Sequence, residues 1–359
     1  MAPSSWTVIC CPVAGKKKGK ETVENEFLPA FRETLGENVP VEVVLTESKG
    51  HATELAKKYG SADNGLIAVG GDGTIHEVMD GLIEKGVLAE TPLGLLSQGT
   101  MNFYAISGGL ASASELPKLI AAGSTRQSSL MRVKDAKGMV DTMCFEALYF
   151  GVGYKPAKGA QEWRNSCMGP MFGIMKNLVV ANMFPKSTAV SGKLRLWPSD
   201  GGDVVEMNDT FFWIVVTQRS PYNGALCEDM WVSLLPLADF PGFGRMMNFF
   251  GPPMELFSGM AHAFQSHHRV KKFEWTQDEK CGPIGVCLDG DPTDASNSIT
   301  VEHVKGAWKI VAEETYPERV PGHMTKVGAT TTCAKKWLEA NPPPEGVYMP
   351  KAGTKPTKK

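Results

Sequence analysis

The alternation of two hydrophobic periodicities over residues 6–125 is the feature that most constrains the fold of this chain. Apolar runs typical of buried strands occur at 6–12, 41–45, 66–69 and 93–96. The segments between them carry apolar residues at helical spacing, at 21–35, 51–59 and 75–83. Strands that alternate with helices are joined by right-handed crossovers, which build a parallel sheet covered on both faces. The sequence therefore predicts an N-terminal α/β domain with a parallel sheet.

From about residue 128 the pattern changes to strand-like runs separated by turns. These runs lie at 129–134, 139–150, 194–196, 211–217, 231–235, 270–275, 284–288, 299–304 and 308–311. With one helix expected at 171–183, this favours an antiparallel, β-sandwich-like domain with a few helices. The expected boundaries are 1–127 for the α/β domain, 128–320 for the β domain and 321–359 for a partly disordered C-terminal extension.

Composition excludes several classes of protein. Lys and Arg number 37 against 39 Asp and Glu, so a net charge of −2 disfavours a nucleic-acid binder. No apolar run approaches the roughly 18 residues that a membrane-spanning helix needs. The eight cysteines form no CxxC pair, which favours reduced thiols in a cytoplasmic protein over a zinc site.

The segment 66–78 carries the most information about function. An apolar strand leads into Gly70-Gly71-Asp72-Gly73-Thr74, and a helix is expected to begin at once. Glycine allows a ligand to approach the backbone closely, and a helix N-terminus presents unpaired N–H groups to an anion. In an open parallel sheet, the carboxyl ends of the strands are where ligands bind. The segment therefore predicts a phosphate-binding loop.

Asp72 is an unusual residue for such a loop. A carboxylate repels a bound phosphate unless it holds Mg²⁺ or accepts a proton, and phosphoryl transfer requires both roles. The alternative is that Asp72 caps the following helix or stabilises the turn. The spacing of the glycines fits neither the dinucleotide fingerprint nor, at Gly15–Glu21, the P-loop.

Two more strand ends carry polar groups. The strand at 93–96 is followed by Gly99 and Thr100, and the strand at 41–45 by Thr46. Because parallel strands end at the same edge of a sheet, we expect the three loops to surround one nucleotide.

On these residues, the sequence resembles the diacylglycerol kinase catalytic superfamily, which includes sphingosine, ceramide and acylglycerol kinases. The GGDGT signature stands at Gly70–Thr74, followed by His76-Glu77, and the GTxN element at Gly99–Asn102. The N-terminal NPxxG appears as Cys11-Pro12-Val13-Ala14-Gly15, and the C-terminal DGE as Asp289-Gly290-Asp291. The resemblance runs over most of residues 6–312.

The resemblance implies a lipid kinase that binds ATP and Mg²⁺ between its two domains and phosphorylates a lipid hydroxyl. It implies that either Asp72 or Asp291 is the proton acceptor, and that Asp72 supports the metal. It also implies nucleotide contacts from Pro12, Thr46, Gly70, Gly71, Asp72, Gly73, Thr74, Glu77, Gly99, Thr100, Asn102, Arg164, Asp289 and Gly290.

Departures from the family pattern leave alternatives open. Cys11 and Asp291 replace the usual asparagine and glutamate, which is compatible with a nucleotide- or lipid-binding member that has lost turnover. An NAD kinase also uses a GGDG loop, although it would lack the two later elements. The segment 151–159 contains no acid and two lysines, which favours diacylglycerol or another neutral lipid over a sphingoid base.

Two segments rich in Phe and Met, 171–184 and 240–264, suit an acyl-chain cleft or a surface that rests on a membrane. The alternative is that both simply cover the β domain. With the lipid substrate, they predict a cytoplasmic protein that associates transiently with membranes.

Overall fold

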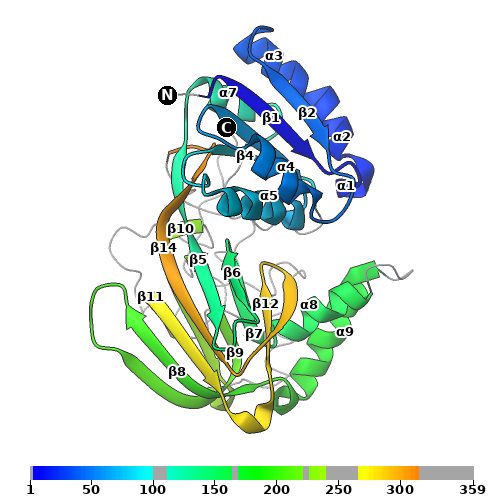
Figure 1. Cartoon of the computed structure of the whole chain (residues 1–359). Helices are drawn as coiled ribbons and strands as arrows, with labels where there is room; N and C mark the ends of the chain where they lie inside the picture. Colours follow the sequence, from blue (N-terminus) through cyan, green and yellow to red (C-terminus); the bar gives the residue numbers. More distant parts are fainter. Residues whose placement is uncertain (1–2, 100–110, 164–168, 221–225, 240–265, 315–359) are drawn as a thin grey trace, which may run out of the picture. The chain divides into compact units, whose positions relative to one another are not determined.

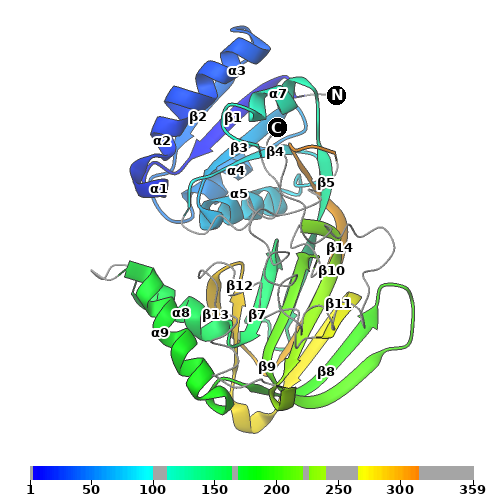
Figure 2. The ribbon, with the colours of Figure 1, turned by 180° about the vertical axis from the view of Figure 1, so that it is seen from behind.

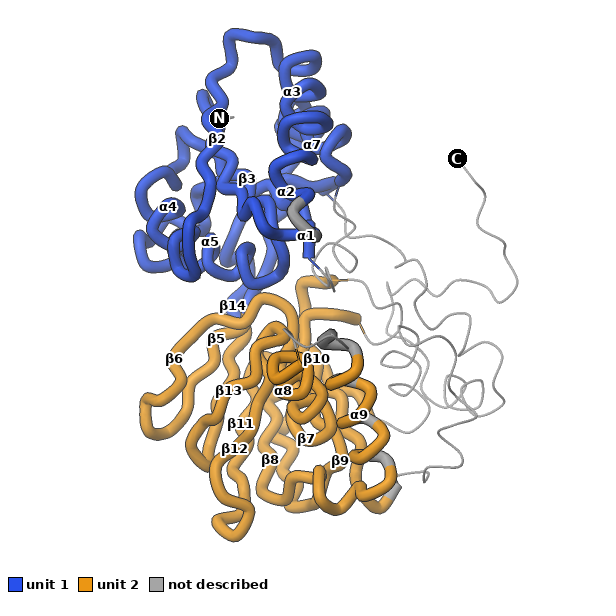
Figure 3. Tube along the Cα trace, turned by 90° about the vertical axis from the view of Figure 1, so that its right-hand side faces the viewer, with its two compact units in different colours: residues 1–130, 304–317 blue, residues 131–303, 318–359 orange. Residues whose placement is uncertain are grey.

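A computed structural model of the chain describes residues 3–99, 111–163, 169–220, 226–239 and 266–314. The chain forms two compact units, coloured separately in Figure 3: unit 1, residues 1–130 and 304–317, and unit 2, residues 131–303 and 318–359. The segment 304–317 thus belongs to unit 1, whereas the sequence boundaries place all of it in the β domain. The expected extension 321–359 and the segment 240–264 lie outside the described residues.

Unit 1 contains a parallel sheet of four complete strands, in the order β4-β3-β1-β2. Their bounds are Ser5–Cys10 (β1), Val41–Leu45 (β2), Asn64–Gly70 (β3) and Pro92–Ser97 (β4). The end of β14 (Ser298–Ile310) adds a parallel edge to β4, where Ile310 pairs with Leu93. This arrangement confirms the predicted α/β class.

Helices cover both faces of this sheet (Figure 1). One face packs on a continuous run of helices and on α7: Ala14–Lys17 (α1), Gly19–Thr22 (α2), the π-helix Val23–Phe27 (η1), Leu28–Leu35 (α3) and Leu116–Ala121 (α7). The other face packs on α4 (His51–Tyr59) and α5 (Asp72–Lys85). Both faces are therefore buried, which explains why the strands are apolar at successive positions.

Unit 2 is built on antiparallel strands, as predicted. They are β5 (Arg126–Asp135), β6 (Asp141–Cys144), β7 (Ala147–Gly151), β8 (Val190–Pro198), β9 (Val205–Arg219), β10 (Leu226–Pro236), β11 (Ser266–Gln277), β12 (Ile284–Leu288), β13 (Asp291–Ala295) and most of β14. Their order is β13-β12-β7-β9-β10-β11-β14, with β8 paired to β9 and β11, and β5 to β6 and β14. Short 3₁₀ turns lie at Pro185–Ser187 (η2), Leu237–Asp239 (η3) and Glu279–Cys281 (η4).

Two helices pack against one another in unit 2, and the first of them also packs on the β12–β13 hairpin (Figure 2). The sequence predicts one of them, α9 (Gly169–Met183), but not α8 (Tyr154–Glu162). Across the described part of the chain, no helix combines the length and the apolar character that crossing a bilayer requires.

Candidate functional site

The carboxyl ends of the four parallel strands of unit 1 lie at one edge of the sheet, and hydrogen bonds tie the loops that follow them to neighbouring strands. These bonds run from Thr46 N to Cys10 O (2.9 Å), from Cys11 N to Val69 O (2.8 Å) and from Gln98 N to Gly70 O (2.6 Å). These hydrogen bonds fix the positions of the backbone groups at this edge of the sheet.

Glycines let the loops after β1, β3 and β4 approach one another closely. A Cβ built on Gly71 would lie 3.2 Å from the Cα of Gly99, so the two loops are in contact there. Gly15 has φ +60°, and its Cβ would lie 2.8 Å from the carbonyl oxygen of Gln98. Larger residues would separate these loops, which is the reason for glycine at both positions.

The predicted phosphate loop leads directly into α5. Gly71 is the N-cap of this helix, and its carbonyl accepts hydrogen bonds from Thr74 N (2.9 Å) and Ile75 N (3.2 Å). The Thr74 side chain lies over Gly70, where a Cβ would be 2.5 Å from the Thr74 Oγ1. Gly73, in contrast, faces open space, with no heavy atom within 4 Å of a Cβ among the described residues. The loop thus presents bare backbone beside a helix N-terminus, as an anion-binding site requires.

Asp72 is the first residue of α5 and is half-buried. The positive end of the helix dipole favours a negative charge at this position. Among the described residues, no three His, Cys, Asp or Glu side chains gather as a metal-ligand set. One carboxylate still fits Mg²⁺, because this ion is commonly held by one or two carboxylates together with substrate phosphates and water.

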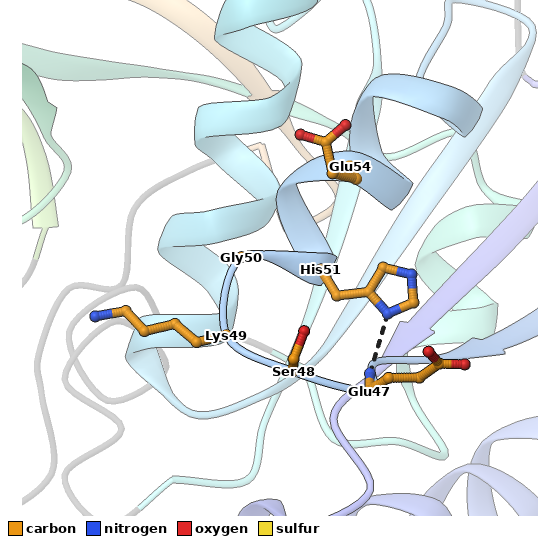
Figure 4. Close-up of a pocket in the computed structure, with 6 residues that line it drawn as sticks. All are labelled: Glu47, Ser48, Lys49, Gly50, His51 and Glu54. Carbon is orange, nitrogen blue, oxygen red and sulfur yellow. Dashed lines mark hydrogen bonds between the residues drawn. The ribbon is translucent and has the colours of Figure 1, made fainter.

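An open pocket of about 410 Å³ lies in the loop that follows Thr46 (Figure 4). In this loop Glu47 N donates a hydrogen bond of 3.0 Å to His51 Nδ1, which fixes the turn into α4. The pocket is lined by Glu47, Ser48, Lys49, Gly50, His51 and Glu54. It therefore adds charged groups of both signs to the segment between β2 and α4.

The three residues of the DGE-like element lie in unit 2, at the turn between β12 and β13. The Asp289 carboxylate accepts hydrogen bonds from four donors: Phe145 N (2.7 Å), Glu146 N (2.8 Å), Ala147 N (3.0 Å) and Cys144 Sγ (3.1 Å). These bonds hold the bend between β6 and β7. Asp289 itself has φ +47°, and Gly290 has φ +94°. Four donors of the protein itself thus hold this carboxylate in place.

Asp291 is exposed, and it accepts a hydrogen bond of 3.1 Å from Gln161 Nε2 of α8. At the other end of α8, Tyr154 Oη donates to Asp294 Oδ1 at 2.8 Å. Burial and the neighbouring Asp294 raise the pKa of Tyr154. An acid from β13 therefore lies beside the segment 151–159, together with the two lysines of that segment.

The structure brings part of the expected site together. Unit 1 holds the following members at the sheet edge or in α5: Pro12, Thr46, Gly70, Gly71, Asp72, Gly73, Thr74, Glu77 and Gly99. Thr100, Asn102 and Arg164 lie outside the described residues. Sequence reasoning missed Gln98 and Asp294, since the first acts through its backbone and the second lies far along the chain from α8.

Comparisons with known proteins agree with this geometry. Residues 5–133 match the family model of the diacylglycerol kinase catalytic domain. A sphingoid long chain base kinase 4 of Schizosaccharomyces pombe is 38% identical over 104 residues, which are 28% of this chain and 22% of that protein. A probable lipid kinase YegS of Salmonella arizonae is 35% identical over 127 residues, which are 34% of this chain and 42% of that protein. The match thus spans less than half of either relative.

The fold also has solved counterparts. A putative diacylglycerol kinase from Bacillus anthracis str. Sterne superimposes with a TM-score of 0.63 at 15% identity, over 87% of this chain and 96% of that one. Such low identity shows the shared fold alone. Together with the sequence matches, the glycine loop at α5 and the parallel sheet that carries it, these findings show that residues 5–133 are similar to the diacylglycerol kinase catalytic domain.

Proposed function

We propose that the protein is an ATP-dependent lipid kinase, which transfers the terminal phosphoryl group of ATP to a lipid hydroxyl. The observation that carries this proposal is the loop Gly70–Gly73 at the N-terminus of α5, in contact with Gly99 of the next loop. Backbone N–H groups in such a loop bind a polyphosphate. The relatives named as sphingoid base and lipid kinases support a lipid as the acceptor.

In this proposal the loops of unit 1 hold the nucleotide. The backbone of Gly70–Thr74 binds the phosphates, and Thr46 binds at the neighbouring strand end. Asp72 holds Mg²⁺, which neutralises phosphate charge when it is bound with ATP. Further nucleotide contacts are proposed for Pro12, Glu77, Gly99, Thr100, Asn102, Arg164, Asp289 and Gly290.

A carboxylate accepts the proton of the lipid hydroxyl as its oxygen attacks the γ-phosphorus and ADP leaves. Asp72 and Asp291 are the two candidates, and their variants separate the roles. If Asp291 is the acceptor, Asp291→Asn lowers kcat by about 10²–10⁴-fold and leaves the affinity for ATP unchanged. Asp72→Asn then weakens Mg²⁺-dependent ATP binding, because it removes the carboxylate that holds the ion.

The acceptor lipid is either a neutral lipid, such as diacylglycerol, or a sphingoid base. Two lysines in 151–159 oppose a cationic head group, whereas Asp294, bonded to Tyr154, favours one. Both classes therefore belong in the test.

The test is a labelled-ATP assay with diacylglycerol, monoacylglycerol, sphingosine and ceramide, scored by extraction into organic solvent. A phosphorylated lipid partitions into the organic phase, whereas the product of an NAD kinase stays in water. We expect label in the organic phase with wild type and its loss with Asp72→Asn. Glu84→Gln, on the exposed far end of the same helix, is the matched control.

Equal absence of turnover in wild type and Asp72→Asn across the panel, with ATP still bound, would contradict the kinase proposal. It would support a binding protein that has lost catalysis. Label that appears only in an aqueous NAD-dependent product would support the NAD kinase alternative.

A further inference from the structure

The helix α9 is mostly apolar and has no continuous polar side. Of its 15 residues, only Lys176, Asn177 and Asn182 are polar. A helix on the surface of a globular protein normally carries a polar outer side, and a helix that is apolar all round needs cover on every side.

On one side, α9 packs against α8. Gly159 and Gly173 bring the two backbones together, since a Cβ on Gly173 would meet the carbonyl group of Gly159. Next to them, the rings of Trp163 and Phe172 lie 4.6 Å apart between centroids. Ala181, two turns further on, is fully buried.

The opposite side of α9 is exposed. Met175, Val179 and Met183 follow one another at intervals of four residues and so form one stripe along the helix. Their exposed fractions are 39%, 43% and 56%. Val180 and Phe184 flank the stripe with 41% and 59% exposed. We name these five residues the α9 apolar face.

The charged residues in the sequence on either side of this face are all basic. From residue 163 to residue 199 the sequence contains no Asp or Glu but five basic residues, Arg164, Lys176, Lys186, Lys193 and Arg195. Lys193 and Arg195 form ion pairs with Glu206. Lys176 lies within the exposed side of α9, and Lys186 is exposed just beyond its end. Their ammonium groups complement an anionic surface.

We propose that the α9 apolar face docks on the interface of a lipid bilayer that contains anionic lipids. Apolar side chains enter the boundary between head groups and acyl chains, and the lysines contact the lipid phosphates and carboxylates. This proposal deepens the proposed kinase function, on which it rests for the identity of the surface, because a lipid substrate lies in such a bilayer.

Co-sedimentation of the full chain with vesicles, without ATP, tests the proposal. We expect binding to vesicles of phosphatidylcholine and phosphatidylserine, weaker binding to phosphatidylcholine alone, and a further loss at high salt. The double variant Val179→Gln/Met183→Gln should lower the partition coefficient at least tenfold, since two side chains lose their burial in lipid. Val204→Gln is the matched control, because Val204 is 38% exposed elsewhere in unit 2.

Three results would overturn the proposal. The first is wild-type binding that the double variant does not reduce, or that is absent altogether. The second is a large fall in the melting temperature of the double variant, which would show that the face is part of the core. The third is a lipid-independent dimer that the double variant dissociates, which would make the face a contact between copies.

A second assay separates this proposal from the kinase activity. Phosphoryl transfer to a short-chain lipid dispersed as monomers needs no vesicle, so the double variant should retain it. Loss of turnover on the monomeric lipid in wild type would contradict the kinase proposal alone. Retained turnover with unchanged vesicle binding in the double variant would contradict the docking proposal alone.

Discussion

Three consecutive backbone N–H groups, those of Phe145, Glu146 and Ala147, converge on the carboxylate of Asp289. Such an array stabilises a carboxylate strongly, and a neutral amide offers only one acceptor oxygen to it. We expect Asp289→Asn to lower the free energy of unfolding by about 2–4 kcal/mol. Asp291→Asn, at an exposed carboxylate two residues away, is the matched control and should change it by less than about 0.5 kcal/mol. Urea denaturation measures both, and equal effects would contradict the role of Asp289 as an anchor.

Replacement by alanine should have different effects on the free energy of unfolding at Gly15 and at Gly73. Gly15 has φ +60° and lies against the carbonyl of Gln98, so Gly15→Ala should destabilise unit 1 by about 1–2 kcal/mol. Gly73 lies in a helix and faces open space, so Gly73→Ala should leave the free energy of unfolding unchanged or raise it. Since we propose that phosphate occupies that space, Gly73→Ala should weaken ATP binding tenfold or more. Calorimetric titration with ATP checks this, and unchanged affinity would move the phosphates away from Gly73.

The cysteines differ in reactivity because they differ in burial. Burial, above all, raises the pKa of Cys10 to about 11 and that of Cys287 to about 12, so each thiol stays protonated and unreactive at neutral pH. Cys281 is exposed. Alkylation of the native protein with iodoacetamide at about pH 8, followed by mass spectrometry, should modify Cys281 and spare Cys10 and Cys287 until denaturant is added. Rapid modification of Cys10 in the native protein would contradict its burial.

At the residue scale, the glycine loop and its helix follow from the sequence, because glycine and a helix start have local signals. The role of Asp289 as an anchor for the backbone could not be predicted from the sequence. Its partners lie more than 140 residues earlier in the chain, and a carboxylate in a motif gives no sign of whether it contacts a ligand or the backbone.

At the scale of elements, the contact between α8 and α9 depends on a pair of glycines. A Cβ on Gly173 would meet the carbonyl group of Gly159, whereas replacing a helical glycine with alanine normally stabilises a helix by about 0.5–1 kcal/mol. We expect Gly173→Ala to have the opposite sign and to destabilise unit 2 by about 1–3 kcal/mol. Thermal unfolding measures this, and the helical Gly73→Ala serves as its control. A more stable Gly173→Ala protein would contradict the close packing of these helices.

The sequence predicts the bounds of helices and strands well where a single hydrophobic periodicity holds. It predicts them poorly where tertiary contacts determine where an element ends. The strand at 41–45 and the helix at 51–59 have the expected bounds. The run 139–150, expected as one strand, is two, β6 and β7, since the Asp289 carboxylate binds the backbone between them. The runs 299–304 and 308–311 are one strand, β14, in spite of Gly306 with φ +58°.

At the scale of the whole molecule, β5 and β14 each begin in one unit and end in the other. Within unit 1, Trp308 is fully buried and its Nε1 donates to the Ser129 carbonyl at 3.1 Å. The matched family model ends at residue 133, so it does not include this strand. Unit 1 is therefore completed by residues from near the end of the described chain.

This dependence predicts the effect of a distant substitution on unit 1. Trp308→Ala should lower the free energy of unfolding by about 3–5 kcal/mol, because it leaves a large cavity and removes the hydrogen bond to the Ser129 carbonyl. Hydrogen exchange should then accelerate in β4, the strand that β14 pairs with. Lys305→Ala, also in β14 but on an exposed side chain, is the control. Faster exchange confined to unit 2 would contradict the assignment of this segment to unit 1.

The position of β14 near the end of the described chain affects how unit 1 forms during synthesis on the ribosome. The strand that covers the edge of β4 ends at residue 310, 180 residues after the first part of unit 1 ends at residue 130. At roughly 5–20 residues per second, translation of that stretch takes about 10–35 s. During this interval the nascent α/β layer has an open sheet edge, which is a template for wrong pairing. Newly made chains thus expose the edge of β4 until residue 310 has left the exit tunnel.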